Sequence, residues 1–599
     1  MKRKFMLVLL AVVMTVACAF GLAACDMFKN NDSSVHEHDY FYLYDEAYHW
    51  LECYCGDEKD KTVHELEEID RRLECPVCGY ASMEFQLNEE ESGYTLVDIL
   101  YPNSREVTVP STFNGLPVTG IGDSAFSVCT ELTSVTIPDS VASIGRSAFQ
   151  GCTGLTSVTI PDSVTSIGDC AFQFCESLTS VNIPNSVECI GESAFANCYN
   201  LTNVTIGSGV TTIGAGAFFD CDSLTTITIP FVGAEKDGTE NTNFSYIFGV
   251  DSDDLPSSLK TVVITGGTTI DESAFFRCYE LTSIVLPDSV TEIGREAFCS
   301  CSELRSITIP SKVTSIGENA FAYCNKLTTI YYNAENASIS SDWDWEYYGA
   351  FCHAGREGDG IEVIFGDSVR SIPEYLFYVY LPYSSGNFTP NITSVTIGKN
   401  VTAISWGAFQ NCDSLTSVYY QGDISDWCCN ITGLNNLMSY DPTLYINGQE
   451  LVGELEIPDG VREIENSAFR GCNKLTGVSI PNSITQIKDS AFYGCAELTN
   501  ITIPASVTSV GSSAFRNCTE LTSITIPDSV TSIGSSAFYG CAGLTSVSIP
   551  DSVTDIESSV FYGCTGLTGI TIPDSVTNIG NSVFYGCTGL TGITIPDSV

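Results

Sequence analysis

Basic residues are scarce in this sequence, which has 25 lysines and arginines against 73 aspartates and glutamates and a formal net charge of −48. Recognition of phosphate groups depends on a basic surface. The deficit therefore argues against a nucleic acid partner and against docking of the folded part on anionic lipid. An acidic surplus of this size fits a long, soluble, exported protein.

Histidine and the usual catalytic motifs are also missing from most of the chain. His353 is the only one of five histidines beyond residue 64. It follows Cys352 directly, and adjacent residues rarely reach the orientation that a thiol–imidazole pair needs. The sequence has no H-E-x-x-H, no G-x-S-x-G and no phosphate-cradling glycine loop. The aspartates that recur after the strands supply one carboxylate per repeat, too few for calcium. We therefore expect no enzyme.

Long apolar runs are missing beyond the N-terminus, so the rest of the protein is expected outside the membrane. Residues 1–24 have a basic start and an apolar stretch, the pattern of an export signal. The end of this stretch, Leu22-Ala23-Ala24-Cys25, resembles a bacterial lipobox, which implies cleavage before Cys25 and lipid attachment to it. An ordinary signal or a membrane-spanning anchor is the alternative. Residues 25–35 are predicted to be a flexible linker.

One phrase, LTSITIPDSVTSIGSSAFYGCAG, organises most of the chain. It spans Leu521 to Gly543, is 23 residues long, and starts again at Leu544. A strict period of this length is typical of a solenoid, in which each repeat contacts only its neighbours. Further copies start at Leu132, Leu155, Leu178, Leu201, Leu475, Leu498, Leu567 and Leu590.

One repeat has too few apolar side chains to close a core, so stacked repeats must cover one another. LTSITI predicts a strand with Ile524 and Ile526 facing inward, because strand side chains alternate. A proline ends the strand, and a short helical turn capped by Ser535 or Ser536 is expected to follow. The apolar positions are Leu521, Ile524, Ile526, Val530, Ile533, Ala537, Phe538 and Cys541.

The repeat reads L-x-x-V-x-I-P-x-x-V-x-x-I-G-x-x-A-F-x-x-C and resembles the BspA-like (treponemal-type) leucine-rich repeat over roughly residues 85–599. Ser529 stands where the common leucine-rich repeat has Asn or Cys. The resemblance implies an α/β leucine-rich-repeat solenoid, here of about 19 coils with parallel β strands and short helical turns. It also implies a cell-surface role, because BspA-like proteins are associated with attachment to host matrix proteins and cells.

Fifteen of the 27 cysteines occupy one repeat position, for example Cys518 and Cys541. One inward-facing cysteine per coil acts as a small buried hydrophobe, so we expect a ladder of free thiols rather than a disulfide framework. A few bridges between stacked neighbours are the alternative.

Residues 36–79 differ in composition and hold four of the five histidines. Thiolate and imidazole ligands suit tetrahedral zinc, so this small module is predicted to be zinc-ribbon-like with a structural zinc site. Its predicted ligands are Cys53, Cys55, Cys75 and Cys78, with His49 or His64 as alternates. One or two disulfides are the alternative, since export allows them.

Residues 80–131 are predicted to form a capping hairpin and a first irregular repeat, followed by the solenoid at 132–599. The sequence stops in mid-repeat, and we expect it to be a fragment of a longer chain. Insertions interrupt the solenoid near 231–258, 333–359 and 420–451. Such elaborations often bind partners; the alternative is an enlarged helical segment with aromatics packed inward.

Large residues on the outward strand face gather in the middle third of the chain, near these insertions. Rigid aromatics anchor protein partners at low entropy cost. The residues predicted to contact a partner are Tyr331, Trp343, Trp345, Tyr347, Tyr348, Tyr419 and Trp427. The leading hypothesis is a bacterial surface lipoprotein that binds an extracellular protein or mediates adhesion. The alternatives are an envelope spacer without a specific ligand and a carbohydrate-processing accessory.

Overall fold

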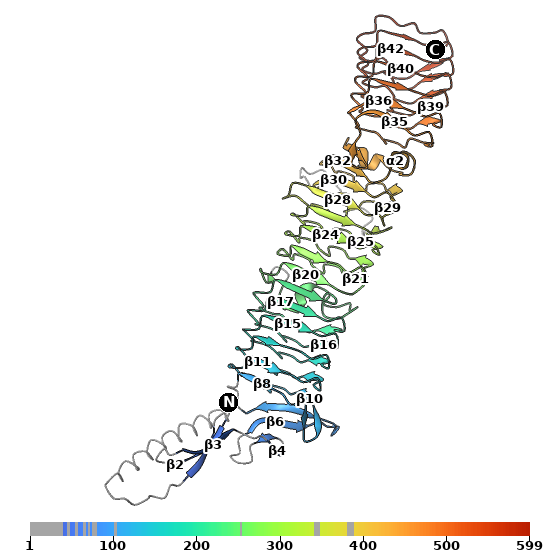
Figure 1. Cartoon of the computed structure of the whole chain (residues 1–599). Helices are drawn as coiled ribbons and strands as arrows, with labels where there is room; N and C mark the ends of the chain where they lie inside the picture. Colours follow the sequence, from blue (N-terminus) through green and yellow to red (C-terminus); the bar gives the residue numbers. More distant parts are fainter. Residues whose placement is uncertain are drawn as a thin grey trace, which may run out of the picture. The chain divides into compact units, whose positions relative to one another are not determined.

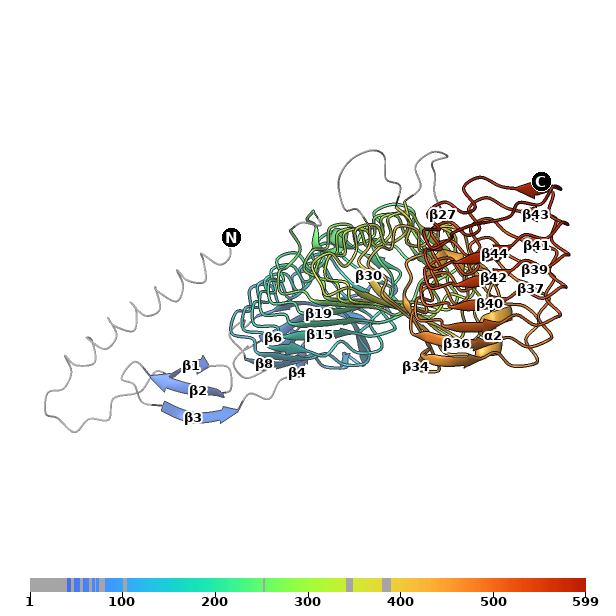
Figure 2. The ribbon, with the colours of Figure 1, turned by 90° about the horizontal axis from the view of Figure 1, so that it is seen from above.

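Coils of parallel β structure make up most of the chain (Figure 1). The computed structural model describes residues 81–100, 105–251, 254–340, 348–379 and 389–599, together with the strands between residues 40 and 74. The chain divides into two compact units, Met1–Ser223 and Leu224–Val599. In each unit, successive coils contribute strands to two parallel rows, and the view from above shows both rows among the last coils (Figure 2).

The first unit contains an antiparallel part that continues into one of its parallel rows. Strands β4 to β7 pair antiparallel in order, and β7 then pairs in parallel with β10. This sheet comprises β4 (Glu67–Ile69), β5 (Arg72–Glu74), β6 (Ala81–Leu87), β7 (Tyr94–Ile99), β10 (Leu116–Ile121), β12 (Ser143–Ile144), β14 (Ser166–Ile167), β16 (Cys189–Ile190) and β18 (Thr212–Ile213), with β9 (Thr112–Phe113) beside β10.

The other strands of the first unit form its second parallel row and a separate N-terminal sheet. The second row consists of β8 (Glu106–Thr108), β11 (Ser134–Thr136), β13 (Ser157–Val158), β15 (Ser180–Ile183) and β17 (Asn203–Ile206). The antiparallel N-terminal sheet consists of β1 (Tyr40–Tyr44), β2 (Tyr48–Cys53) and β3 (Glu58–Val63).

The hairpin β6–β7 covers the first coil. Phe85 on β6 stacks on Phe113 with ring centroids 4.4 Å apart, and both rings are fully buried. Leu96 on β7 is buried beside them. The sheet edge continues from β6 to β5 through antiparallel pairing of residues 72–74 with residues 81–84. Within the described residues, no helix has the length and hydropathy to cross a membrane.

The second unit repeats this two-row arrangement. Its first row begins with β19 (Thr226–Ile229), β20 (Thr261–Ile264), β22 (Ser283–Val285), β24 (Ser306–Ile309), β26 (Thr329–Tyr332), β28 (Ile361–Phe365), β30 (Ile392–Ile397), β32 (Ser417–Tyr420) and β33 (Thr443–Ile446), closed by antiparallel β34 (Gln449–Glu450). A new sheet then contains β35 (Gly453–Glu456), β36 (Leu475–Ser479), β38 (Asn500–Thr502), β40 (Ser523–Thr525), β42 (Ser546–Ser548) and β44 (Gly569–Thr571).

The second row of this unit consists of short strands in three sheets. They are β21 (Thr269–Ile270), β23 (Glu292–Ile293), β25 (Ser315–Gly317) and β27 (Ser338–Ser340); β29 (Ser371–Ile372) and β31 (Ala403–Ile404); and β37 (Gln486–Ile487), β39 (Ser509–Val510), β41 (Ser532–Ile533), β43 (Asp555–Ile556) and β45 (Asn578–Ile579). The helices among the described residues are the 3-10 helix η1 (Phe244–Phe248), α2 (Ile424–Cys429) and α3 (Asn435–Met438).

The core is shared between coils, as the repeat predicts. All eight apolar positions of the repeat at 521–543 are at most 5% exposed. Phenylalanines stack from coil to coil, with centroids of Phe515 and Phe538 5.5 Å apart and those of Phe538 and Phe561 5.7 Å apart. In the first unit, Phe149 and Phe172 stack in the same way at 5.0 Å. Each coil therefore supplies one face of its neighbour's core.

The segment before the repeat cysteine is a series of turns, which corrects the predicted short helical turns. Ser536 has φ 61° and Gly540 has φ 72°, so both adopt the left-handed conformation. Two such residues four positions apart interrupt a right-handed helix. The backbone groups that are left without a helical partner form hydrogen bonds to the next coil. For example, Phe538 N–H donates to the carbonyl of Val560 at 3.0 Å.

Side chains also donate between coils. Ser529, at the position where other leucine-rich repeats have Asn, donates through its hydroxyl to the carbonyl of Val507 at 2.7 Å. The thiol of Cys541 donates to the carbonyl of Phe515 at 3.1 Å, and Cys518 reaches Phe492 at 3.2 Å. The described repeat cysteines are free, which confirms the thiol ladder among these residues.

The ladder thiols are expected to resist alkylation. Burial raises the pKa of Cys198 to about 12, and at pH 8 a thiol with that pKa is only on the order of 10⁻⁴ thiolate, the reactive form. Cys189 is exposed. Iodoacetamide labelling of the native protein at pH 8, read by peptide mass spectrometry, should modify Cys189 long before Cys198. In denaturant both should react alike; equal native labelling would contradict the buried ladder.

Candidate functional site

The outward strand face of the second unit changes character at its centre. In regular coils this face carries small hydroxyl residues, such as Ser523 and Thr525 on β40, both exposed. Between β22 and β33 several of the equivalent positions carry larger side chains, although Thr308 on β24 and Thr396 on β30 keep the regular residue type. We call this part of the strand face the central patch, which consists of Val285, Tyr331, Glu362, Ile364, Thr396, Tyr419 and Tyr445.

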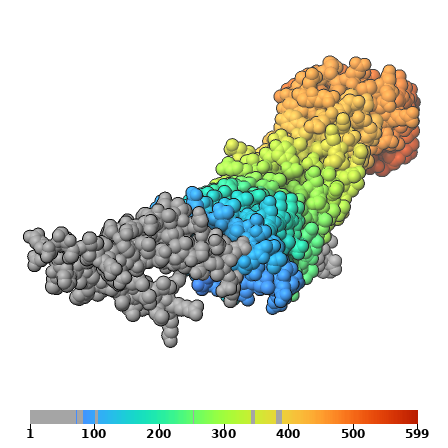
Figure 3. Space-filling view, turned by 60° about the horizontal axis from the view of Figure 1, so that its bottom comes forward, coloured from blue at the N-terminus to red at the C-terminus, as the bar shows by residue number. Residues whose placement is uncertain are grey.

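Strand register places the members of the central patch in line. Tyr331 pairs with Ile364 across β26 and β28, and Tyr419 with Tyr445 across β32 and β33. The rings of Tyr419 and Tyr445 stack at 4.6 Å with an interplanar angle of 19°. Tyr331 is 44% exposed and Val285 47%. The yellow and orange residues of this unit form one unbroken surface in the space-filling view (Figure 3).

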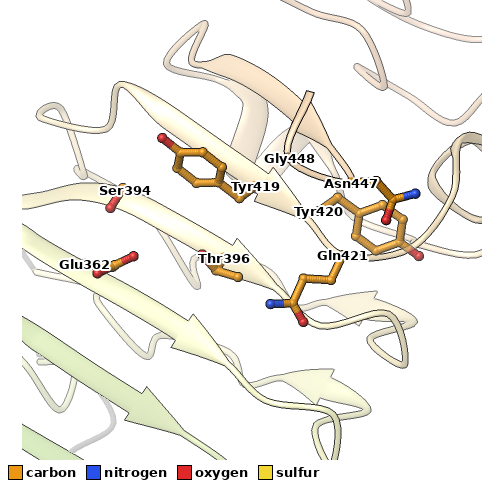
Figure 4. Close-up of a pocket in the computed structure, with 8 residues that line it drawn as sticks. All are labelled: Glu362, Ser394, Thr396, Tyr419, Tyr420, Gln421, Asn447 and Gly448. Carbon is orange, nitrogen blue, oxygen red and sulfur yellow. The ribbon is translucent and has the colours of Figure 1, made fainter. Parts of the chain in front are cut away.

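An open hollow of about 600 Å³ lies within the central patch. Its lining residues are Glu362, Ser394, Thr396, Tyr419, Tyr420, Gln421, Asn447 and Gly448. Figure 4 shows Glu362, Ser394 and Tyr419 extending from three strands, with Gln421 and Asn447 beyond the strand ends. The turn at Asn447 and Gly448 has positive φ at both residues, the geometry of a two-residue hairpin turn, and it returns the chain as β34.

The hollow combines one carboxylate with hydroxyl, amide and aromatic groups. Glu362 is exposed, and its carboxylate stands on the same face as the Tyr419–Tyr445 pair. A cationic side chain can pair with such a carboxylate while its stem or charge rests against an aromatic ring. The hollow is therefore suited to a basic side chain on a protein surface.

Trp427 is not part of this surface, so its prediction as a partner-contacting residue is wrong. It lies on α2, is fully buried, and packs 5.3 Å from the ring of Tyr420. The third insertion instead matches the alternative of a helical segment with its aromatic packed inward. Trp427 was misread because an aromatic residue among acids in an insertion gives no indication of burial.

Trp427 replaces a backbone donor that the insertion removes. In regular coils the alanine before each core phenylalanine accepts a bond from the preceding coil, as Ala537 does from Phe515 N–H at 2.8 Å. At the insertion, the Trp427 indole N–H donates to the carbonyl of Ala468 at 2.8 Å. The Tyr440 hydroxyl similarly donates to the carbonyl of Phe409 at 3.0 Å, where regular coils use a cysteine thiol.

Several predicted site residues lie outside what the structure describes. Trp343, Trp345 and Tyr347 fall outside the described residues, as do Cys25, Cys55, His64, Cys75 and Cys78. His49 and Cys53 belong to β2, for which only the strand is described. The lipid and zinc predictions therefore stay predictions. Among the described residues there is no cluster of three potential metal ligands.

The remaining predicted contacts divide between exposed and packed positions. Tyr331 and Tyr419 belong to the central patch, whereas Tyr348 packs against a small cluster of Cys299, Ala322, Cys352 and Val379. His353 is 5% exposed and stacks on Tyr323 at 4.4 Å. Burial lowers the pKa of His353 to about 4, so this ring is neutral at physiological pH.

Ile364 and Tyr445 are members of the central patch that sequence reasoning missed. Ile364 pairs with Tyr331 and Tyr445 pairs with Tyr419, so both occupy the same outward strand position. The coils that carry them depart from the 23-residue spacing, and Ile364 lies in a coil that follows a long insertion. The signal that could have found them is alternation within the strand rather than the repeat period.

Coils with parallel strands, a shared core and one ladder residue per turn define a leucine-rich repeat protein. The family model described as "BspA type Leucine rich repeat region (6 copies)" matches residues 119–235, 256–343, 360–432, 447–568 and 508–599. The chain therefore belongs to the BspA-type leucine-rich repeat family. Such repeat proteins are typically scaffolds for protein interaction, and members of this family are generally surface-exposed bacterial proteins.

Solved structures of bacterial leucine-rich repeat proteins are similar to this chain. One is the Treponema pallidum leucine-rich repeat protein, with 28% identity, 37% of this chain and 88% of that chain covered, and TM-score 0.27. Another is a leucine-rich cell surface protein from Faecalibacterium prausnitzii, with 26% identity, 84% and 93% covered, and TM-score 0.22. A third comes from Bacteroides ovatus, with 23% identity, 86% and 94% covered, and TM-score 0.24. No curated protein matches the sequence.

Removing either substitute donor is expected to weaken the second unit. Trp427→Phe leaves the buried carbonyl of Ala468 without its donor, and Tyr440→Phe does the same to Phe409. Each variant should lower the free energy of unfolding by about 1–3 kcal/mol in chemical denaturation. Tyr419→Phe, on the exposed face, is the control and should change it by less than about 0.5 kcal/mol. Equal free energies of unfolding in all three variants would show that the two donors do not contribute to stability.

Proposed function

We propose that this protein is a cell-surface lipoprotein that binds an extracellular protein through the central patch. The observation that carries the proposal is the contrast on one strand face. Regular coils present small hydroxyl side chains, whereas β22 to β33 present Tyr331, Tyr419 and Tyr445. Tyr331 is exposed and Tyr419 and Tyr445 are half-buried. Solvent-accessible tyrosines held on a rigid sheet lose little entropy on binding, which favours their use as anchors of an interface.

The proposed partner has a basic surface. The chain carries a net charge of −48, so a basic protein is attracted over distance and an acidic one is repelled. Glu362 in the hollow supplies the local counterpart, an exposed carboxylate beside Tyr419. A lysine or arginine on a host matrix protein or on a neighbouring cell has the chemistry that this site accepts.

The proposed anchor is a lipid on Cys25, which would hold the solenoid outside the cell membrane. The small module at residues 36–79 would then lie between the anchor and the coils, stabilised by a structural zinc or by disulfides. The cysteine-containing end of the export signal supports this proposal.

Mass spectrometry of the membrane fraction of expressing cells should find a diacylglyceryl mass on Cys25. The Cys25→Ala variant should lack this mass; a wild-type protein without lipid contradicts the anchor.

Binding through the central patch predicts a selective loss in tyrosine variants. The purified protein is assayed for binding to extracted host matrix proteins by surface plasmon resonance. Tyr331→Ala and Tyr419→Ala should each weaken binding of the captured matrix protein by about tenfold or more, the loss typical of a truncated anchor residue. Binding should also weaken as salt rises, because exposed charges are screened.

Tyr279→Ala is the matched control. Tyr279 is 38% exposed in the same unit but follows the repeat cysteine Cys278 and lies off the strand face. This variant should bind like the wild type. If the Tyr331 and Tyr419 variants bind as well as the control, the central patch is not the binding surface.

A further inference from the structure

A second surface lies in the last described coils, on the turns rather than on the strands. Two residues before each repeat cysteine, the side chains form a continuous column. We call it the Arg–Tyr ladder, which consists of Arg470, Tyr493, Arg516, Tyr539, Tyr562 and Tyr585. The equivalent positions in earlier coils of this unit include Cys299, Ala322 and Gln410, so the repeat itself does not require this column.

The ladder is held by direct contacts between neighbouring coils. The Arg470 guanidinium lies 4.2 Å from the Tyr493 ring centroid, and the Arg516 guanidinium lies 4.0 Å from that of Tyr539. Tyr539 and Tyr562 stack at 4.5 Å, and Tyr562 and Tyr585 at 4.8 Å. Stacking covers the ring faces between neighbours. Five ladder members are half-buried and Tyr585 is exposed. With the ring faces covered, the groups left to contact a ligand are ring edges, phenol hydroxyls and guanidinium nitrogens other than the buried Arg516 Nε.

The two arginines differ in charge compensation. Arg470 pairs with Asp441 at 2.8 Å and donates to the carbonyl of Ser439 at 3.1 Å. Among the described residues Arg516 has no carboxylate partner, and its buried Nε atom has no hydrogen-bond partner. Arg516 is thus an uncompensated cation, flanked by Tyr493 and Tyr539, on a strongly acidic protein.

The surface beside the ladder is formed by small residues with positive φ. The residue after each ladder member has positive φ; these residues are Gly471, Gly494, Asn517, Gly540, Gly563 and Gly586. An added Cβ at Gly563 would meet only the Gly540 backbone, at 3.7 Å, so no side chain fills the space between these coils. The glycine peptide groups therefore border the tyrosine column, and the Asn517 side chain lies over Gly540, the residue after Tyr539.

We propose that the Arg–Tyr ladder binds a sugar chain that carries an isolated carboxylate, with Arg516 pairing to the carboxylate and the tyrosine hydroxyls and Asn517 bonding to sugar hydroxyls. A hydrogen-bonding strip with covered ring faces suits a hydroxyl-rich ligand better than an apolar one. One uncompensated arginine on a chain of net charge −48 matches a single anionic group and excludes a dense polyanion. This site is separate from the central patch, whose partner is a basic protein.

Calorimetric titration of the purified full chain tests the ladder. The probes are 3′-sialyllactose, which has one carboxylate; lactose, which has none; and triglutamate, an acidic peptide. Sialyllactose should bind. The affinity for lactose should be lower by about tenfold or more, since a charged hydrogen-bonded pair is lost. Absence of sialyllactose binding overturns the proposal, and so does preference for triglutamate over the sugar.

Variants separate Arg516 from its matched neighbour. Arg516→Gln should reduce sialyllactose affinity about tenfold or more, to the level of lactose, whereas Arg470→Gln, whose charge Asp441 already neutralises, should bind like the wild type. Equal loss in both variants, or no loss in Arg516→Gln, overturns the assignment. If Arg516→Gln fails to fold, Arg516→Lys takes its place, because lysine keeps the charge but lacks the planar guanidinium. An unchanged affinity of the Arg516→Lys variant for sialyllactose would also contradict the assignment. Binding of the protein partner at the central patch should be the same in all these variants.

Discussion

The structure depends on contact between consecutive coils. A repeat of 23 residues cannot bury its own apolar side chains, and the stacked phenylalanines, such as Phe515 between Phe492 and Phe538, are buried only because both neighbours are present. Backbone and side-chain donors reinforce the same contact: the Cys518 thiol bonds to the previous coil, and Phe515 N–H bonds to the next. Burial and hydrogen bonding therefore act across one interface, repeated along each unit.

This constraint explains where variation is tolerated. Inward positions must stay apolar and must donate to the neighbouring coil. An insertion that removes a coil's donors must therefore replace them, as Trp427 and Tyr440 do. Outward positions carry no such requirement, so the strand face and the turn column can change without loss of the core. The central patch and the Arg–Tyr ladder occupy these two unconstrained surfaces, and their proposed ligands are a basic protein and an acidic sugar.

Much of the fold could be predicted from the sequence, because the 23-residue period indicates both where the strand lies and which apolar residues are buried. Leu521, Ile524 and Phe538 are buried as predicted. The predicted helical turn was wrong because Ser536 is left-handed. Serine rarely adopts that conformation, so its presence in the sequence gave no sign of it. For the site, Tyr331 follows from strand alternation. Trp427 misled because burial in an insertion depends on tertiary contacts, and the Arg516 environment depends on side chains from three coils.

The central claim, that neighbouring coils build one another's core, is tested most directly by hydrogen–deuterium exchange on a Phe515→Ala variant. The account predicts faster amide exchange in the altered coil and in both adjoining coils, around Phe492 and Phe538, with unchanged exchange in distant coils such as that of Ile307. Loss of protection confined to the altered coil, or spread evenly over the whole chain, would contradict it.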